Sequence, residues 1–363
     1  MTAGARRHAD ARLVVQTWFV TRLLMALVGL WLMVSEGREF TDLVGNWDVQ
    51  HFLAIASKGY AAPDDIAFFP GWPLLLRLAS VPGTSMVVMG TFLALLASGF
   101  AAAALFRLAG APAAIAWLLA PTAVFTMVPY TESVFCAAAF WAWERATAKQ
   151  WAAAAVLASV AAAVRVSGVF LIVALVVLAL TSGGSSRDKG KRLLWLLFPV
   201  FVVVAYLAYL YSMTGNWLAW YDAQATGWSR GFTWPWDALR HTFEAFAPGA
   251  YADHPEWAWV FRAEVVSMAV GVAVTLVCLV RRRWAEATWV GLQVGAFSVS
   301  YWFMSVNRAV LLWFPLWTLL GELGESKRKL PTWRAVLIGL LVAVALVVQV
   351  IWAWLFFTGR WAS

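Results

Sequence analysis

The chain has 363 residues, of which 63% are hydrophobic and 13% charged, and its formal net charge is +8. This composition excludes a soluble domain with a charged surface. Apolar runs such as 164–180, 265–280 and 335–357 follow one another with short polar breaks, and each is close to the roughly 20 residues that cross a hydrocarbon core. We therefore expect an all-α polytopic membrane protein that forms one integral domain over residues 1–363.

Hydropathy predicts about eleven transmembrane or re-entrant helices. In chain order they are 13–34, 86–106, 111–128, 131–144, 151–163, 164–180, 193–212, 264–280, 285–303, 309–321 and 334–357. Segments 131–144, 151–163 and 309–321 are shorter than a full crossing, so we expect them to be tilted, broken or re-entrant and packed against protein. No small-residue cleavage site follows the first run, which favours a retained span over a removed signal peptide.

The distribution of Lys and Arg orients these spans. Seventeen of the 27 basic residues fall on the side of the N-terminus: Arg6, Arg7, Arg12, Arg107, Arg145, Lys149, Arg187, Lys189, Lys191, Arg192, Arg281, Arg282, Arg283, Lys327, Arg328, Lys329 and Arg334. The positive-inside rule predicts that this side, with the N-terminus, is cytoplasmic. The net positive charge then suits an anionic membrane leaflet rather than a nucleic acid.

Two segments on the opposite side are long enough to build structure outside the membrane. They are residues 35–85 and the Trp-rich residues 213–263, and both combine Trp, Tyr, Asp, His and Arg. Aromatic side chains there either lie at the level of the lipid headgroups or stack against sugar rings, and Trp228 is a candidate for the second role. Residues 182–191, SGGSSRDKGK, are predicted to form a flexible cytoplasmic linker.

The first of these loops contains GNWDVQHFLAIASKGY, residues 45–60. Gly45 and Asn46 predict a turn and a helix N-cap, and the apolar residues that follow have helical spacing. Asp48 and His51 are three residues apart and therefore neighbours on one helix face. From spacing alone, Asp48 is either a carboxylate that the helix dipole stabilises or a functional group, and His51 is either an interfacial hydrogen-bond partner or a base.

Several motifs together resemble a known family. NWDVQHFLAIASKGY with the later IAFFPGWPLLLR is similar to the first lumenal loop of the GPI mannosyltransferase II (PIG-V) family. PYTESVFC (129–136), VRVSGVFL (164–171) and SVNRAVLLWFPLW (305–317) resemble further short family motifs. The second of these departs from the family, because Val166-Ser167-Gly168 stands where Ser-Asn-Gly is frequent and an amide is therefore absent.

The resemblance implies a GT-C glycosyltransferase fold with an extracytoplasmic active site. It implies transfer of mannose from a polyprenyl phosphate carrier, with inversion at the anomeric carbon. Inverting transfer needs a base to deprotonate the attacking hydroxyl, and Asp48 is the candidate. The expected partners are polyprenyl phosphate mannose, a lipid or glycan acceptor and membrane lipids. No cofactor and no obligatory metal are expected, because the chain has no Asp-x-Asp motif and a lipid monophosphate carries less charge than a nucleotide diphosphate; the adjacent Asp64 and Asp65 are the alternative, a pair able to bind a metal.

The leaving phosphate needs cationic groups around it. The candidates are His51, Arg165, Arg230 and Arg308, although a lone Arg at a span end also snorkels to the interface. Further candidates for substrate contacts are Trp47, Asp42, Tyr130 and Glu132, in addition to Trp228. Asp42 also competes with Asp48 for the role of base, as do Asp64 and Asp65.

Other functions remain open at this stage. A GT-C transferase could act on protein hydroxyls or move another carrier-linked sugar, and a transporter would also place charges near broken spans, although no paired repeat is evident. Arg outnumbers Lys by 21 to 6, and none of the three Asn residues begins an Asn-x-Ser/Thr sequon. Both features favour a bacterial plasma membrane. The sequence selects neither an acceptor nor an oligomeric state.

Overall fold

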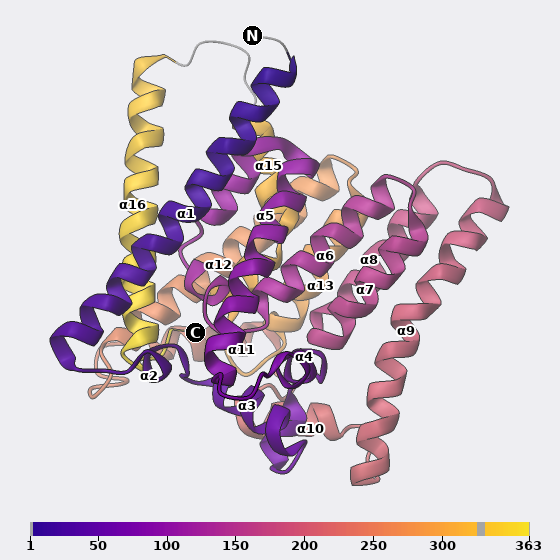
Figure 1. Ribbon diagram of the computed structural model, residues 1–363. Helices are drawn as coiled ribbons and strands as arrows, with labels where there is room; N and C mark the ends of the chain where they lie inside the picture. Colours follow the sequence, from indigo (N-terminus) through magenta and orange to yellow (C-terminus); the bar gives the residue numbers. More distant parts are fainter. Residues whose placement is uncertain (1–2, 325–330, 363) are drawn as a thin grey trace.

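The computed structural model describes residues 3–324 and 331–362, within which every regular element is helical (Figure 1). Five helices are long and apolar enough to cross a membrane. They are α1 (Ala3–Glu36), α5 (Met86–Leu118), α9 (Ser186–Thr214), α12 (Glu256–Val280) and α16 (Thr332–Phe357). The expectation of an all-α polytopic membrane protein is confirmed, whereas the count of eleven spans stays a prediction. Lys327, Arg328 and Lys329 lie outside the described residues.

Shorter helices pack between the long ones. They are α6 (Glu132–Thr147), α7 (Trp151–Val164), α8 (Ser167–Thr181), α13 (Trp284–Ser298) and α15 (Phe314–Gly324). Helix α6 is buried along most of its length, with Phe135 and Phe140 fully enclosed, so it packs against protein as its short length predicted. On α7, Ala154, Ala158 and Ala161 are fully buried, because small side chains let membrane helices approach closely.

The predicted spans 86–106 and 111–128 meet inside α5, where the backbone is non-helical at Ala109 and Gly110 and two helical segments join. The second segment ends at Leu118, ten residues before the predicted end of 111–128. Gly110 has a φ of 75°, which a residue without Cβ adopts readily, and Pro112 follows where its missing N–H costs little. Beyond α5, the chain forms only the 3₁₀ turn η2 (Ala123–Thr126) before α6 begins.

The two long loops fold into short helices that gather at the end of the bundle opposite the N-terminus (Figure 1). Residues 35–85 contain α2 (Phe40–Val44), α3 (Asp48–Lys58), η1 (Pro63–Ala67) and α4 (Gly71–Ala79), and residues 213–263 contain α10 (Ala219–Trp228), α11 (Pro235–Ala245) and the start of α12. Near them, α14 (Val306–Ala309) and η3 (Val310–Leu312) join α13 to α15. This end of the molecule therefore holds every sequence-predicted site residue.

The predicted linker 182–191 is shorter than expected. Helix α9 already begins at Ser186, because the Ser185 hydroxyl accepts the Asp188 N–H and the Asp188 carboxylate accepts the Ser185 N–H. This reciprocal capping satisfies backbone donors that would otherwise have no partner at the helix start. Only residues 182–185 connect α8 to α9.

The tight elbow between α7 and α8 gives a first testable prediction. A Cβ on Gly168 would lie 2.3 Å from Ala162 Cα, so we expect Gly168→Ala to destabilise the protein by about 1–3 kcal/mol through overpacking. Thermal unfolding in detergent measures the effect. Gly339→Ala in α16 is the control, because no atom lies within 4 Å of its Cβ position. Equal melting temperatures for both variants would contradict this close packing.

Candidate functional site

Helix α3 begins at Asp48, as its first residue. Its N-cap is Trp47 and not the predicted Asn46, whose amide instead donates to the carbonyls of Leu43 and Phe356. Trp47 has a φ of 59°, a conformation that costs a residue with a side chain about 1–3 kcal/mol and that clusters at functional sites. The Asp48 N–H donates to the Tyr130 hydroxyl at 3.2 Å. These constraints fix Asp48 at the positive end of α3.

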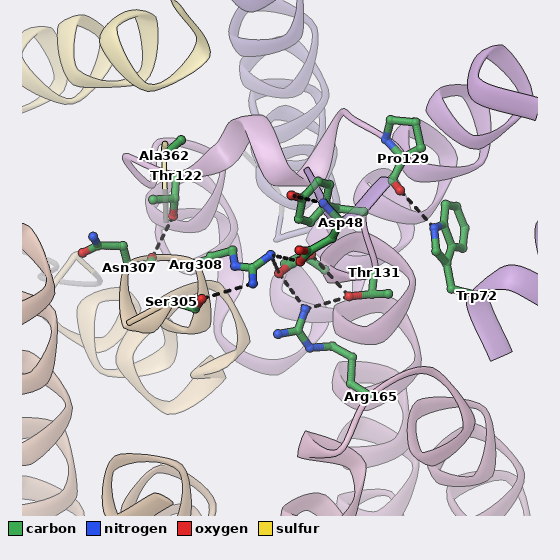
Figure 2. A network of polar contacts seen from close by, with 12 residues as sticks. Asp48, Trp72, Thr122, Pro129, Thr131, Arg165, Ser305, Asn307, Arg308 and Ala362 are labelled. Carbon is green, nitrogen blue, oxygen red and sulfur yellow. Dashed lines mark hydrogen bonds and ion pairs between the residues drawn. The ribbon is translucent and has the colours of Figure 1, made fainter. Parts of the chain in front are cut away.

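The Asp48 carboxylate pairs with an arginine 260 residues away in the chain. Arg308 Nη1 donates to Asp48 Oδ2 at 2.9 Å (Figure 2). The guanidinium lies over the Tyr130 ring and also donates to Ser305 Oγ at 3.2 Å. Asp48 and Glu132 raise the pKa of Arg308 above its usual value, outweighing the opposite effect of burial. Arg308 is therefore permanently charged beside Asp48.

The backbone that carries Arg308 is anchored by Glu264 in α12. One Glu264 oxygen accepts the Ser305 N–H at 2.9 Å and the other accepts the Asn307 N–H at 2.8 Å. Ser305 itself has a φ of 67°. The sequence analysis missed this role of Glu264, although a carboxylate at the edge of an apolar run is a signal that such a residue has a specific partner.

A second buried ion pair adjoins the first. Glu132 is fully buried at the start of α6, and Arg165 Nη1 donates to it at 2.6 Å and to Thr131 Oγ1 at 2.7 Å. Arg308 Nη1 lies 3.8 Å from the same Glu132 oxygen. Asp48, Arg308, Glu132 and Arg165 thus form one alternating chain of charges, which Figure 2 shows in part.

Two cavities meet at this network. The smaller, about 90 Å³, is lined by Asp48 and by Arg165, Arg230 and Arg308. Burial and the neighbouring charges of Arg308 and Arg165 lower the pKa of Arg230 to about 10, so it stays protonated at neutral pH. Asp48, Arg165, Arg230 and Arg308 come from four separate parts of the chain, and the three arginines outnumber the carboxylates Asp48 and Glu132 that pair with them.

The second cavity, about 230 Å³, is lined mainly by aromatic side chains. These are Trp47, Phe125, Tyr130, Trp228, Trp302, Phe356 and Trp361. Asp48, Arg308 and Trp228 line both cavities, so the carboxylate lies on their shared boundary. Trp302 and Trp361 were not among the predicted site residues, since a single Trp in a Trp-rich sequence carries no distinguishing signal.

His51 and Asp42 lie apart from this network. His51 Nδ1 is 3.1 Å from Asp65 Oδ1, and its ring stacks on Phe68 at 4.9 Å and meets Trp228 edge-on at 5.7 Å. The Asp partner of His51 is therefore the buried Asp65, although Asp48 is its neighbour on α3. Asp42 is exposed on α2 and lines neither cavity.

Comparison with known proteins relates part of this chain to a family. Residues 33–182 match the sequence profile of the family described as Mannosyltransferase (PIG-V). This segment of the chain is therefore similar to the PIG-V mannosyltransferase family. The matched segment holds Asp48, Tyr130, Glu132 and Arg165, whereas Arg308 lies beyond it. The resemblance of residues 305–317 to the PIG-V family therefore stays a prediction.

Named relatives of the PIG-V family also match part of the chain. "GPI alpha-1,6-mannosyltransferase 2" of Mus musculus is 31% identical over 144 residues, covering 34% of this chain and 29% of the mouse protein. The protein of the same name from Cricetulus griseus is 33% identical over 111 residues, covering 25% of this chain and 22% of the hamster protein. The chain thus matches less than a third of the length of these relatives. No solved structure shows significant similarity.

Proposed function

We propose that this PIG-V family protein transfers mannose from a polyprenyl phosphate mannose donor to a hydroxyl of a lipid or glycan acceptor, with inversion, on the extracytoplasmic face of a bacterial plasma membrane. The observation that carries the proposal is the place of Asp48, which lies between an arginine-lined cavity and an aromatic cavity. One carboxylate on that boundary reaches groups bound on either side. The name of the matched family supports the sugar and the reaction class.

The arginine-lined cavity is the proposed site of the donor phosphate. As the bond from the anomeric carbon to the phosphate oxygen breaks, negative charge grows on the phosphate, and preorganised cations stabilise it. Arg165 and Arg308 have carboxylate partners, whereas Arg230 forms no ion pair within the described part of the chain. Burial and, to a lesser extent, repulsion from Arg308 and Arg165 lower the pKa of Arg230, and a phosphate among the three arginines would offset that repulsion.

Asp48 is the proposed general base, which accepts the proton of the acceptor hydroxyl as its oxygen attacks the anomeric carbon. Its pairing with Arg308 orients the carboxylate on the boundary of the two cavities. A donor phosphate bound beside Arg308 would share that guanidinium.

The aromatic cavity is the proposed place of the acceptor. Its indole rings have the flat faces on which sugar rings stack, and it opens beside Asp48, so a bound hydroxyl would approach the carboxylate. Acceptor and donor would then meet at Trp228, Asp48 and Arg308, which line both cavities. We propose no metal for this reaction, since three arginines already supply the positive charge.

Membranes that contain the protein and labelled polyprenyl phosphate mannose provide the direct test. We expect label in a lipid or glycan fraction and inversion at the anomeric carbon of the product. Label in the protein fraction would instead indicate transfer to protein hydroxyls, and label from a different carrier-linked sugar would change the donor. If no mannose were transferred to any acceptor in these membranes, the proposed function would be wrong.

Arg230→Gln gives a prediction specific to the arginine-lined cavity, which we call the donor cavity. Loss of a charge-assisted contact of roughly 1.5–3 kcal/mol is expected to raise the donor KM by about 10- to 100-fold. Arg240→Gln is the matched control, because Arg240 lies in the same segment but is largely exposed and pairs with Asp237. Steady-state kinetics with varied donor measure both variants. An equal donor KM for the two variants would show that Arg230 does not contribute to donor binding.

A further inference from the structure

The turn between α6 and α7 and the connection from α8 to α9 lie at the end of the bundle opposite α3 (Figure 1). Residues of both segments line a cavity of about 850 Å³. Its lining includes the basic residues Lys149, Lys191 and Arg192 and the indoles of Trp151 and Trp195. No residue of this cavity belongs to the two cavities beside Asp48. The positive-inside rule predicts that this end is cytoplasmic.

The charged side chains that line this cavity differ in whether they already have hydrogen-bond or ion-pair partners. Arg192 is buried and donates to the carbonyls of Ala179, Ser182 and Gly183, so it closes the end of α8. The Asp188 carboxylate is occupied by Ser185 at the start of α9. In contrast, neither Lys149 nor Lys191 forms an ion pair within residues 3–324 and 331–362.

A second observation is a buried donor without a partner. Trp151 is 7% exposed and lines the cavity, and its indole Nε1 has no hydrogen-bond partner. An unpaired buried N–H is costly, and such a group frequently indicates a missing acceptor. The positive charge of Arg192 lies over the same ring at 5.7 Å. Both features favour an anionic acceptor in the cavity.

The surface next to the cavity is apolar and exposed. Along α9, the exposed apolar side chains near Trp195 include Leu194, Leu197, Phe198 and Phe201, and Phe201 is 71% exposed. In a membrane these side chains face acyl chains. A cationic cavity directly above such a surface matches a molecule with an anionic head and apolar tails.

We propose that this cavity binds the phosphate headgroup of an anionic phospholipid of the cytoplasmic leaflet, with the acyl chains along α9. Lys149 and Lys191 would contact the phosphate, and Arg192 would keep the connection between α8 and α9 in shape. Lys and Arg side chains near a membrane surface are attracted to anionic lipid headgroups. The inference does not depend on the proposed transferase activity, because no residue is shared between the sites.

The test uses the full-length protein purified in detergent and titrated with phosphatidylglycerol, with retained lipid counted by native mass spectrometry. The cavity variant is Lys149→Gln with Lys191→Gln. Its matched control is Arg187→Gln with Lys189→Gln, which removes the same charge from the first turn of α9 without touching the cavity lining. We expect the affinity for phosphatidylglycerol to fall about tenfold or more in the cavity variant and by less than twofold in the control.

Two further ligands separate the alternatives. Phosphatidylcholine is expected to bind the parental protein weakly, and inorganic phosphate alone is expected to compete poorly. Equal losses in the cavity and control variants would show general surface attraction and overturn the proposal. Competition by inorganic phosphate at the same concentration as the lipid would also overturn it, because the acyl chains would then contribute nothing. Trp151→Phe should weaken lipid binding while the protein stays folded.

Discussion

Asp48→Asn is expected to lower mannosyl transfer by about 10²- to 10⁴-fold, the usual contribution of a general base. The asparagine amide has nearly the shape of the carboxylate, and its oxygen can still accept from Arg308, so the fold and the donor cavity should persist. The loss should therefore appear in kcat, with the donor affinity retained. Rates of label transfer and equilibrium binding of the donor measure the two quantities separately.

Asp42→Asn is the control for this experiment, because Asp42 is an exposed carboxylate in the same segment that lines neither cavity. It should transfer mannose at the parental rate. A folded Asp48→Asn protein with parental activity would assign the base elsewhere. The pair of half-buried His51 and buried Asp65 would then be the next candidate, because the His51 ring lies against Phe68 and Trp228, which line the donor cavity.

Glu132→Gln is expected to destabilise the protein by about 3–5 kcal/mol, the cost of removing one partner from a buried ion pair. Glu132 is fully buried and is the carboxylate that holds Arg165, with Arg308 nearby. Without its charge, two arginines lose the group that orients them beside the donor cavity. Donor affinity should therefore fall together with stability, as thermal unfolding and donor titration in detergent would show.

The Glu144→Gln variant separates the effect on stability from the effect on donor affinity. Glu144 lies at the other end of α6, where it is buried and pairs with Arg107 and Arg145. Its replacement should lower the melting temperature but leave donor binding unchanged, because the donor cavity is distant. Parental donor affinity in a folded Glu132→Gln protein would show that Glu132 acts on stability alone.

The regular patterns of the sequence were sufficient for the local elements. The helical spacing after Asn46 predicted α3, and the apolar runs predicted the long helices, because a helix that crosses lipid must satisfy its backbone internally. The boundary predicted between 106 and 111 coincides with the non-helical backbone at Ala109 and Gly110, whereas the end of the second segment at Leu118 was predicted too late. Gly110 and Pro112 interrupt the local pattern, but the end at Leu118 depends on packing against distant residues.

The sequence indicated which residues belong to the candidate site, but it did not indicate which of them form ion pairs with one another. Asp48, Arg165, Glu132 and Arg308 were all named from motifs and span ends, yet nothing in the sequence indicated which carboxylate pairs with which arginine. Spacing favoured Asp48 as the neighbour of His51, but the ring turns to Asp65. A helix face fixes which residues are adjacent, whereas the rotamer that each side chain adopts depends on groups from elsewhere.

The sequence by itself determined the membrane class, the long apolar helices and the similarity of residues 33–182 to the PIG-V family, because each depends on composition or on short-range patterns. Only the tertiary structure decided that Arg308 pairs with Asp48, that Glu264 holds the backbone of Arg308, and that two cavities meet at one carboxylate. These pairings join residues far apart in the chain. Ion pairs of this kind form only where folding brings opposite charges together away from water, which no local pattern encodes.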